Sequence, residues 1–141
     1  MGLINYDDPR RLVRRLLGNF PATTGLSIAG TAASDTVLAR FPVNEAITVS
    51  GSARIRLSTG GTAAGPVLLL CKSLAGTATA GTANAFGTYT FGTAADNTTA
   101  YVTLTSTDFA AGDEIVLVNK AGTVAATPVV IYCMSYCETL Q

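Results

Sequence analysis

The pattern of hydrophobic and polar residues divides the chain into two parts. From Thr36 onward, apolar and polar residues alternate with a period of two in several short segments, such as ARIRLS at 53–58 and YVTLT at 101–105. This alternation is typical of β-strands that turn one face to a core and the other to solvent. Eight segments fit a strand: 36–41, 45–50, 53–58, 66–72, 86–91, 100–105, 114–119 and 128–136. Eight short strands predict a β-sandwich or a barrel.

Two of these segments lack the alternation. VLLLC at 67–71 and IVLV at 115–118 are continuous apolar runs. Such runs are typical of strands that are covered on both faces, in the middle of a sandwich or at a subunit contact. Glycine-containing pairs predict the turns between strands. These pairs are Gly51-Ser52, Gly60-Gly61, Gly112-Asp113 and Ala121-Gly122.

The N-terminal stretch DDPRRLVRRLLG, residues 7–18, has a helical period instead. Asp8 suits the N-cap, Pro9 suits the first helical position, and Gly18 suits the left-handed position after the last turn. The sequence therefore predicts an amphipathic helix over about residues 8–17. Its apolar face consists of Leu12, Val13, Leu16 and Leu17, and its basic face of Arg10, Arg11, Arg14 and Arg15. Because isolated helices shorter than about 12–15 residues are marginal in water, the apolar face must dock on a neighbouring molecule or on the chain's own body.

The stretch between this helix and the first predicted strand, residues 18–35, consists mostly of small and polar residues and is expected to be an extended linker. Phe20, Leu26 and Ile28 are candidate anchors within it. We therefore predict two parts, an N-terminal arm over 1–35 that contains the helix and the linker, and a β-sandwich domain over 36–141.

Charge is distributed as unevenly as hydrophobicity. The formal net charge is +0, but residues 7–18 contain four arginines against two aspartates, which leaves five cations and seven anions for the rest of the chain. Nucleic-acid-binding domains gather basic residues on one folded face, whereas the later basic residues are scattered over strand-like segments, so we expect no nucleic-acid partner. No apolar run approaches the roughly 18 residues of a membrane span, and no signal peptide is recognisable. We therefore expect no membrane partner and no secretory export.

Residues that carry chemistry are sparse. The chain contains no histidine, the side chain that most often acts as a general base near neutral pH. Of the adjacent carboxylates, Asp7 and Asp8 are explained by helix capping, and Asp113 and Glu114 by a turn that leads into a strand. The glycine-rich segments lack the GK[ST] ending of a P-loop and the GxGxxG spacing of a dinucleotide site. We therefore predict a protein that is not an enzyme and has no cofactor.

The three cysteines predict neither a disulfide framework nor a metal site. Cys71, Cys133 and Cys137 are an odd number, which argues against a framework of paired cysteines. If Cys133 and Cys137 lie on one strand, they are about 13 Å apart, too far for a bond between them. A bridge between Cys71 and Cys133 stays open. Zinc is not expected, because histidine and CxxC pairs are both missing.

The chain as a whole resembles tailed-bacteriophage capsid decoration (cement) proteins. The resemblance lies in the arm DDPRRLVRRLLG, in the alanine-, threonine- and glycine-rich loops, and in TSTDFAAGDEIVLV at 105–118, which is similar to a turn-and-strand segment of jelly-roll domains in phage head and fibre proteins. It covers most of the chain and is compositional. It implies an all-β fold, an antiparallel jelly-roll-like β-sandwich of about eight strands preceded by the short helix and the extended linker.

The resemblance also implies a function. Decoration proteins commonly sit as trimers on the outer shell and tie adjacent major capsid subunits together. It therefore implies a homotrimeric virion structural protein that is made in the host cytoplasm, lies on the outer capsid surface and has the major capsid protein as its partner. The arm would act as a clamp that buries its leucines on a neighbouring subunit and pairs its arginines with capsid carboxylates. The predicted partner-binding residues are Arg10, Arg11, Leu12, Val13, Arg14, Arg15, Leu16, Leu17 and Phe20.

Two other functions stay open. A receptor- or glycan-binding domain of a phage head or tail fibre would use the long loops, with Tyr89, Phe91 and Tyr101 as candidate aromatic contacts. Alternatively, the basic arm would lie inside the shell against packaged DNA.

Overall fold

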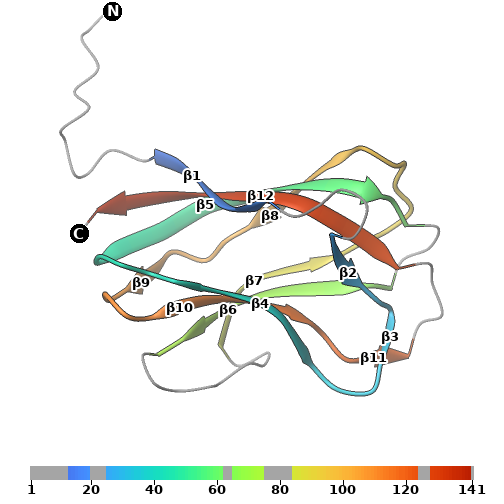
Figure 1. The fold of residues 1–141 in the computed structure, drawn as a ribbon, viewed down its shortest axis with the longest axis horizontal. Coiled ribbons are helices and arrows are strands. Elements are labelled where there is room, and N and C mark those ends of the chain that lie inside the picture. Colours follow the sequence, from blue (N-terminus) through green and yellow to red (C-terminus); the bar gives the residue numbers. More distant parts are fainter. Residues whose placement is uncertain (1–12, 20–24, 62–64, 75–83, 124–127, 141) are drawn as a thin grey trace, which may run out of the picture.

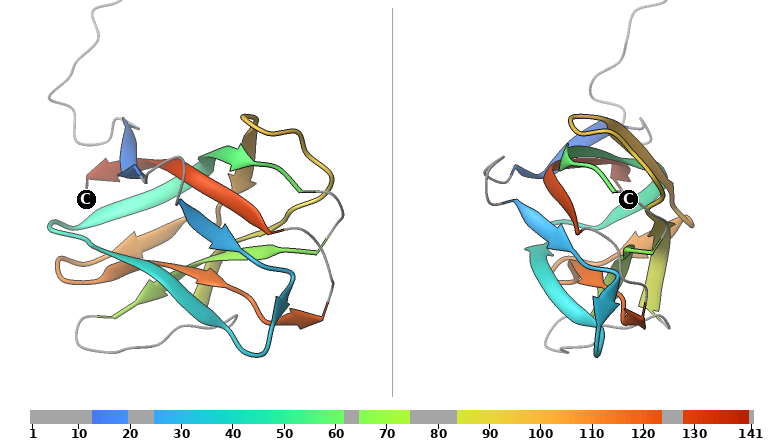
Figure 2. Two further views of the ribbon diagram at one scale, coloured as in Figure 1. Left: turned by 45° about the vertical axis from the view of Figure 1, so that its right-hand side comes forward. Right: turned by 90° about the vertical axis from the view of Figure 1, so that its right-hand side faces the viewer.

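A computed structural model of the chain describes residues 13–19, 25–61, 65–74, 84–123 and 128–140. This part is all-β, with antiparallel sheets stacked face to face as in a β-sandwich and with no α-helix (Figures 1 and 2). The all-β prediction is therefore confirmed. The strands are β1 (Val13–Asn19), β2 (Leu26–Ile28), β3 (Thr31–Ala32), β4 (Thr36–Pro42), β5 (Ile47–Thr59), β6 (Val67–Ser73), β7 (Ala85–Thr90), β8 (Thr99–Thr103), β9 (Thr107–Phe109), β10 (Glu114–Asn119), β11 (Gly122–Thr123) and β12 (Val129–Leu140).

The strands form two large sheets and one small one. The six-stranded sheet has the order β1-β12-β5-β8, with β2 also paired to β12 and β9 to β5. The four-stranded sheet has the order β4-β10-β6-β7, and β11 pairs with β3. Strands from opposite ends of the chain therefore lie side by side, as β1 and β12 do at the top of Figure 1.

The main core lies between the two large sheets. Alternate residues of β5, β6, β8 and β10 face it, as the period-two pattern predicts. Phe86 and Phe109 meet edge to face there, with ring centroids 5.4 Å apart. The largest fully buried side chains of the described residues are Phe91, Phe109, Ile28, Ile55, Leu57, Leu68, Leu69, Leu70, Ile115, Leu117, Ile131 and Met134. Each of these stabilises the fold by about 1.5–3 kcal/mol relative to an exposed side chain.

The two continuous apolar runs are covered on both faces, as predicted. In β6, Leu68 and Leu70 belong to the main core. Their neighbours in sequence point to the opposite side of the strand, and they too are buried. A second buried cluster, on the outer side of the four-stranded sheet, consists of Leu69, Cys71, Val116 and Val118.

One predicted turn is wrong. The segments 45–50 and 53–58 were expected to be separate strands, but β5 runs through both of them without a break. Gly51 takes a φ of 77°, a left-handed conformation that glycine adopts without steric cost. Opposite it on β12, the pairing register shifts between Ser135 and Cys137. The glycine therefore makes an irregularity within a strand and not a reversal of the chain.

The amphipathic helix predicted over about residues 8–17 is not confirmed. Residues 13–17 lie in β1, which pairs antiparallel with β12, and residues 8–12 lie outside the described residues. A helix of about nine residues leaves most of its terminal N–H and C=O groups without partners inside the helix. The edge of β12 offers partners along the whole of β1, so sheet pairing is the better solution for this backbone.

The extended linker expected over 18–35 contains two short strands. β2 pairs with β12, and β3 pairs with β11. Between them, Ala29 is held by the buried side chain of Asn119: the Ala29 N–H donates to Asn119 Oδ1 at 2.6 Å, and Asn119 Nδ2 donates to the Ala29 carbonyl at 3.1 Å. The Ala121 N–H donates to Asp35 Oδ1 at 2.8 Å. This part of the predicted arm is therefore bound to the ends of the sheets.

Candidate functional site

The structure describes five of the nine residues predicted to bind a partner. Those five, Val13, Arg14, Arg15, Leu16 and Leu17, all lie in β1. The other four, Arg10, Arg11, Leu12 and Phe20, lie outside the described residues. The described half of the predicted contact therefore lies on one strand of the six-stranded sheet.

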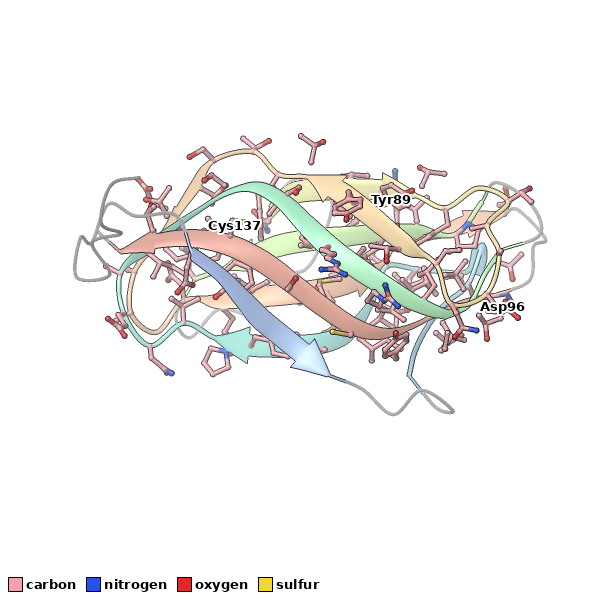
Figure 3. All side chains as sticks on the ribbon, turned by 90° about the horizontal axis from the view of Figure 1, so that it is seen from above. Tyr89, Asp96 and Cys137 are labelled. Carbon is pink, nitrogen blue, oxygen red and sulfur yellow. The ribbon has the colours of Figure 1, made fainter. Side chains whose placement is uncertain are left out.

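β1 is held in a defined register. Arg14 is opposite Cys137, and Leu16 is opposite Ser135. Cys137 is labelled in Figure 3, which looks down on the six-stranded sheet and shows it on β12 beside β1. The strand order places β12 on one side of β1 and no further strand of the described residues on the other. β1 is therefore an edge strand.

One row of residues crosses the whole six-stranded sheet. Leu16 of β1 is opposite Ser135 of β12, Ser135 is opposite Arg54 of β5, and Arg54 is opposite Tyr101 of β8. Ser135, Arg54 and Tyr101 are directly opposite one another in this antiparallel sheet and therefore lie on the same face. The register therefore connects the predicted arm to a group of polar side chains on the outer face of the sheet.

We call this group the arginine–tyrosine face. It consists of Arg54, Arg56, Thr99, Tyr101 and Tyr132. The alternate residues of β5 fix its orientation, because those between and beside the two arginines are 0–1% exposed in the core. Figure 3 shows nitrogen-bearing side chains near the middle of this face, over β5 and β12.

Arg56 is positioned by two neighbours. Its Nε donates to the Tyr132 hydroxyl at 3.2 Å, and its Nη1 donates to Thr99 Oγ1 at 2.8 Å. The hydrogen bond to Tyr132 raises the pKa of the Arg56 guanidinium above its usual value. Since a guanidinium carries five N–H donors, these two bonds hold the group in place and use only some of its donors.

The two arginines of this face have no carboxylate partner among the described residues. The ion pairs there lie elsewhere: Arg40 Nη1 is 2.6 Å from Glu114 Oε2, and Lys72 Nζ is 3.4 Å from Asp113 Oδ2. The positions opposite Arg54 and Arg56 hold serine, tyrosine, cysteine and threonine. This face therefore carries two positive charges that no described side chain neutralises.

Tyr101 is the one strongly exposed aromatic side chain of the described residues, at 58%. The other two aromatics considered for a glycan site lie apart from it. Phe91 is 1% exposed in the core, and half-buried Tyr89 meets it edge to face at 4.9 Å between ring centroids. A site built on all three aromatic rings is therefore not formed.

The carboxylate pair at 113–114 has the structural role that the sequence predicted. Asp113 Oδ2 accepts a hydrogen bond from the Ala110 N–H at 2.9 Å and so closes the turn, and Glu114 begins β10. Gly112, in the same turn, has a φ of 93°. These groups fix the entry to a strand.

Other kinds of site are weakly supported in the described part of the chain. It contains no group of three or more histidine, cysteine or acidic residues that could hold a metal ion. All three cysteines are free thiols, so the bridge between Cys71 and Cys133 that the sequence left open is not formed. No helix among these residues is long and apolar enough to cross a membrane.

In the sequence, Arg54 and Arg56 are scattered charges, and the face that they share with Tyr101 is not predicted. A signal was present, because both arginines occupy the polar positions of ARIRLS and Tyr101 occupies a polar position of YVTLT. What the sequence did not provide was the pairing of these two segments.

Comparison with protein-family models, with curated proteins and with solved structures finds no match to this chain in any of the three.

Proposed function

We propose that this chain is a capsid decoration (cement) protein of a tailed bacteriophage, which binds the outer capsid surface and fastens adjacent major capsid subunits. The observation that carries the proposal is the position of β1. Residues 13–17 of the predicted arm form an edge strand of the same sheet that bears the arginine–tyrosine face. A partner that contacts the arm strand therefore has a second, basic contact on the adjoining surface of the body.

We also propose that the body is a jelly roll, the sandwich type found in viral capsid domains. The pairing of the strands supports this. One set of pairs is nested along the chain: β1 and β2 with β12, β4 with β10, β5 with β8 and β9, and β6 with β7. The remaining pairs of the two large sheets, β12 with β5 and β10 with β6, join these nested pairs side by side. Nested pairs of this kind result when one long antiparallel hairpin is rolled into two stacked sheets.

The physical role of such a protein follows from the thermodynamic linkage between its binding and the stability of the assembled shell. A ligand that binds only the assembled lattice stabilises that lattice by mass action. An arm strand that is already paired in register with the body loses less conformational freedom on binding than a free arm does. Contacts from the arm strand and from the sheet would then be made by one rigid surface.

Nested deletions test the role of the arm. We expect the variant without residues 1–12 to bind expanded capsids of the encoding phage more weakly, because Arg10, Arg11 and Leu12 are gone. The variant without residues 1–19 is expected to lose binding, because β1 is gone as well. Circular dichroism and thermal melting of both variants verify that the two sheets remain folded. Full capsid occupancy by the folded longer deletion would contradict the proposal.

A second function is favoured by one observation, the exposure of Tyr101 beside Arg54. An exposed aromatic ring next to polar groups suits a glycan, as in a receptor-binding fibre domain. Binding of the purified protein to a glycan array, abolished by Tyr101→Ser, would favour this function. Binding to expanded capsids without binding to any glycan would favour the decoration role.

A further inference from the structure

The arginine–tyrosine face has the composition of a protein-binding surface. Arginine and tyrosine are enriched at interfaces and among the residues that dominate binding energy, whereas lysine and the acidic residues are depleted there. The outward positions around Arg54 follow this pattern, with Arg56 and Tyr101 as large side chains and with Ser135 and Thr99 as small ones. The rest of the described surface has exposed large apolar side chains only at Val37 and Leu74.

The spacing of the two guanidinium groups defines what they can recognise. Arg54 and Arg56 are two positions apart on β5, so their Cα atoms are separated by about 6.6 Å on the same face. Each planar guanidinium can bind a carboxylate with two parallel hydrogen bonds. Carboxylates two apart on a strand, or three to four apart on a helix, have a similar spacing of about 5–7 Å.

No carboxylate of the described residues forms an ion pair with this face. Two acidic residues of this sheet are opposite β5. Glu138 of β12 is opposite Val49, is buried, and accepts a hydrogen bond from the Tyr136 hydroxyl at 2.7 Å. Asp108 of β9 is opposite Thr48, six residues from Arg54 and therefore roughly 20 Å away along the strand. Its Oδ1 accepts a hydrogen bond from Thr48 Oγ1 at 2.6 Å. Asp96, in the loop before β8, accepts a hydrogen bond from the Gly60 N–H at 2.8 Å.

We infer that the outer face of the six-stranded sheet, through Arg54, Arg56 and Tyr101, binds a carboxylate-bearing protein surface. The assignment is based on complementary charge. Arg54 and Arg56 are two cations that no described side chain neutralises, on a chain whose net charge is +0. Binding to an extended phosphate backbone needs many basic residues spread over a surface, so two arginines favour a compact acidic surface instead. Arg56 is already fixed by Tyr132 and Thr99, so little side-chain entropy is lost when it binds. This inference does not require the partner to be a capsid protein.

The test uses the full chain and a short fluorescein-labelled oligo-L-glutamate, with fluorescence anisotropy at low ionic strength. The double variant Arg54→Gln/Arg56→Gln is expected to bind about tenfold more weakly than the parent, since two charge-assisted contacts are lost. The matched control is Arg40→Gln/Lys120→Gln, which removes the same charge elsewhere and is expected to bind within about twofold of the parent, because only long-range screened charge changes. Thermal melting verifies that both variants are folded.

A third variant separates charge from geometry. Arg54→Lys/Arg56→Lys keeps both charges but loses the planar guanidinium groups that can bind a carboxylate with two hydrogen bonds. Its affinity for oligo-glutamate is therefore expected to fall by a few-fold, to a value roughly midway between those of the parent and the glutamine variant. Equal weakening in the glutamine variant and its matched control would overturn the inference, because only net charge would matter. Absence of any binding to oligo-glutamate would also overturn it. Tighter binding of an oligothymidylate or a sulfated oligosaccharide, lost in the glutamine variant, would overturn it in favour of phosphate or sulfate.

Discussion

Both large sheets are antiparallel and pack against the same core, but their outer faces differ in polarity. On the six-stranded sheet, β5 and β8 alternate buried aliphatic residues with exposed or half-buried polar ones, so its outer face is basic and hydroxyl-rich. On the four-stranded sheet, β6 and β10 are buried on both sides, and their outward residues form a second apolar cluster. A polar outer face can exchange partners, whereas a buried one contributes to stability.

This difference assigns separate roles to the two faces. Substitutions on the outer side of the four-stranded sheet should change the free energy of unfolding, and substitutions on the arginine–tyrosine face should change binding. The following comparisons run from the largest expected effect on stability to the smallest.

Leu69→Ala should produce the largest loss. Leu69 is 0% exposed on the outer side of β6, and truncation of a buried leucine costs about 2–5 kcal/mol. The matched variant on the other sheet is Tyr101→Ala, which removes a larger side chain that is 58% exposed and should change stability by about 0.5 kcal/mol or less. Urea denaturation measures both free energies. Equal losses would remove the contrast between the sheets.

Asn119→Ala should have an intermediate effect. The side chain of Asn119 serves both backbone groups of Ala29, and it links the end of β10 in one sheet to the residue that follows β2 in the other. Loss of the amide leaves a part-buried N–H and C=O without partners, at about 1–3 kcal/mol. Lys120→Ala serves as the control at the next position. Amide hydrogen exchange should accelerate at Ala29 in the asparagine variant alone, and unchanged protection there would contradict the link.

Arg40→Gln should have a smaller effect than Leu69→Ala or Asn119→Ala. The ion pair between Arg40 and Glu114 is short, but the two side chains are 35% and 33% exposed. Solvent-screened pairs of this kind contribute about 0.2–1 kcal/mol. The loss should shrink further at high salt, whereas that of Leu69→Ala should not. Thermal melting at two ionic strengths measures this difference. If the stability loss of Arg40→Gln did not depend on salt, the packing of the aliphatic part of the Arg40 side chain would matter more than its charge.

Much of the sheet structure could be predicted because it depends on local pattern. The strand of 53–58, for example, follows from the alternation of Ala53, Ile55 and Leu57 with polar residues, and the double burial of VLLLC follows from its unbroken apolar composition. The turn at Gly51 was wrongly predicted, because a glycine marks a backbone that can adopt positive φ but does not decide between a reversal and a bulge.

The N-terminal segment and the arginine–tyrosine face depend on distant partners. Residues 13–17 have a helical hydrophobic period, yet their hydrogen bonds go to β12, more than a hundred residues later in the sequence. In the same way, Arg54 and Tyr101 are neighbours only because β5 pairs with β8. Neither pairing is encoded in the spacing of the residues concerned, so the predicted helix was not confirmed and the face was missed.

Capsid occupancy of two charge-matched variants tests the central claim most directly, namely that the outer face of the six-stranded sheet is the docking face. Under the proposed decoration role, the protein would be added in equal amounts to expanded capsids of the phage that this role implies, and the bound copies would be counted by quantitative electrophoresis. Arg54→Gln/Arg56→Gln should lose about tenfold in affinity, while Arg40→Gln/Lys120→Gln on the other sheet should bind like the parent. Normal occupancy by the first variant, or loss by the second alone, would contradict the account.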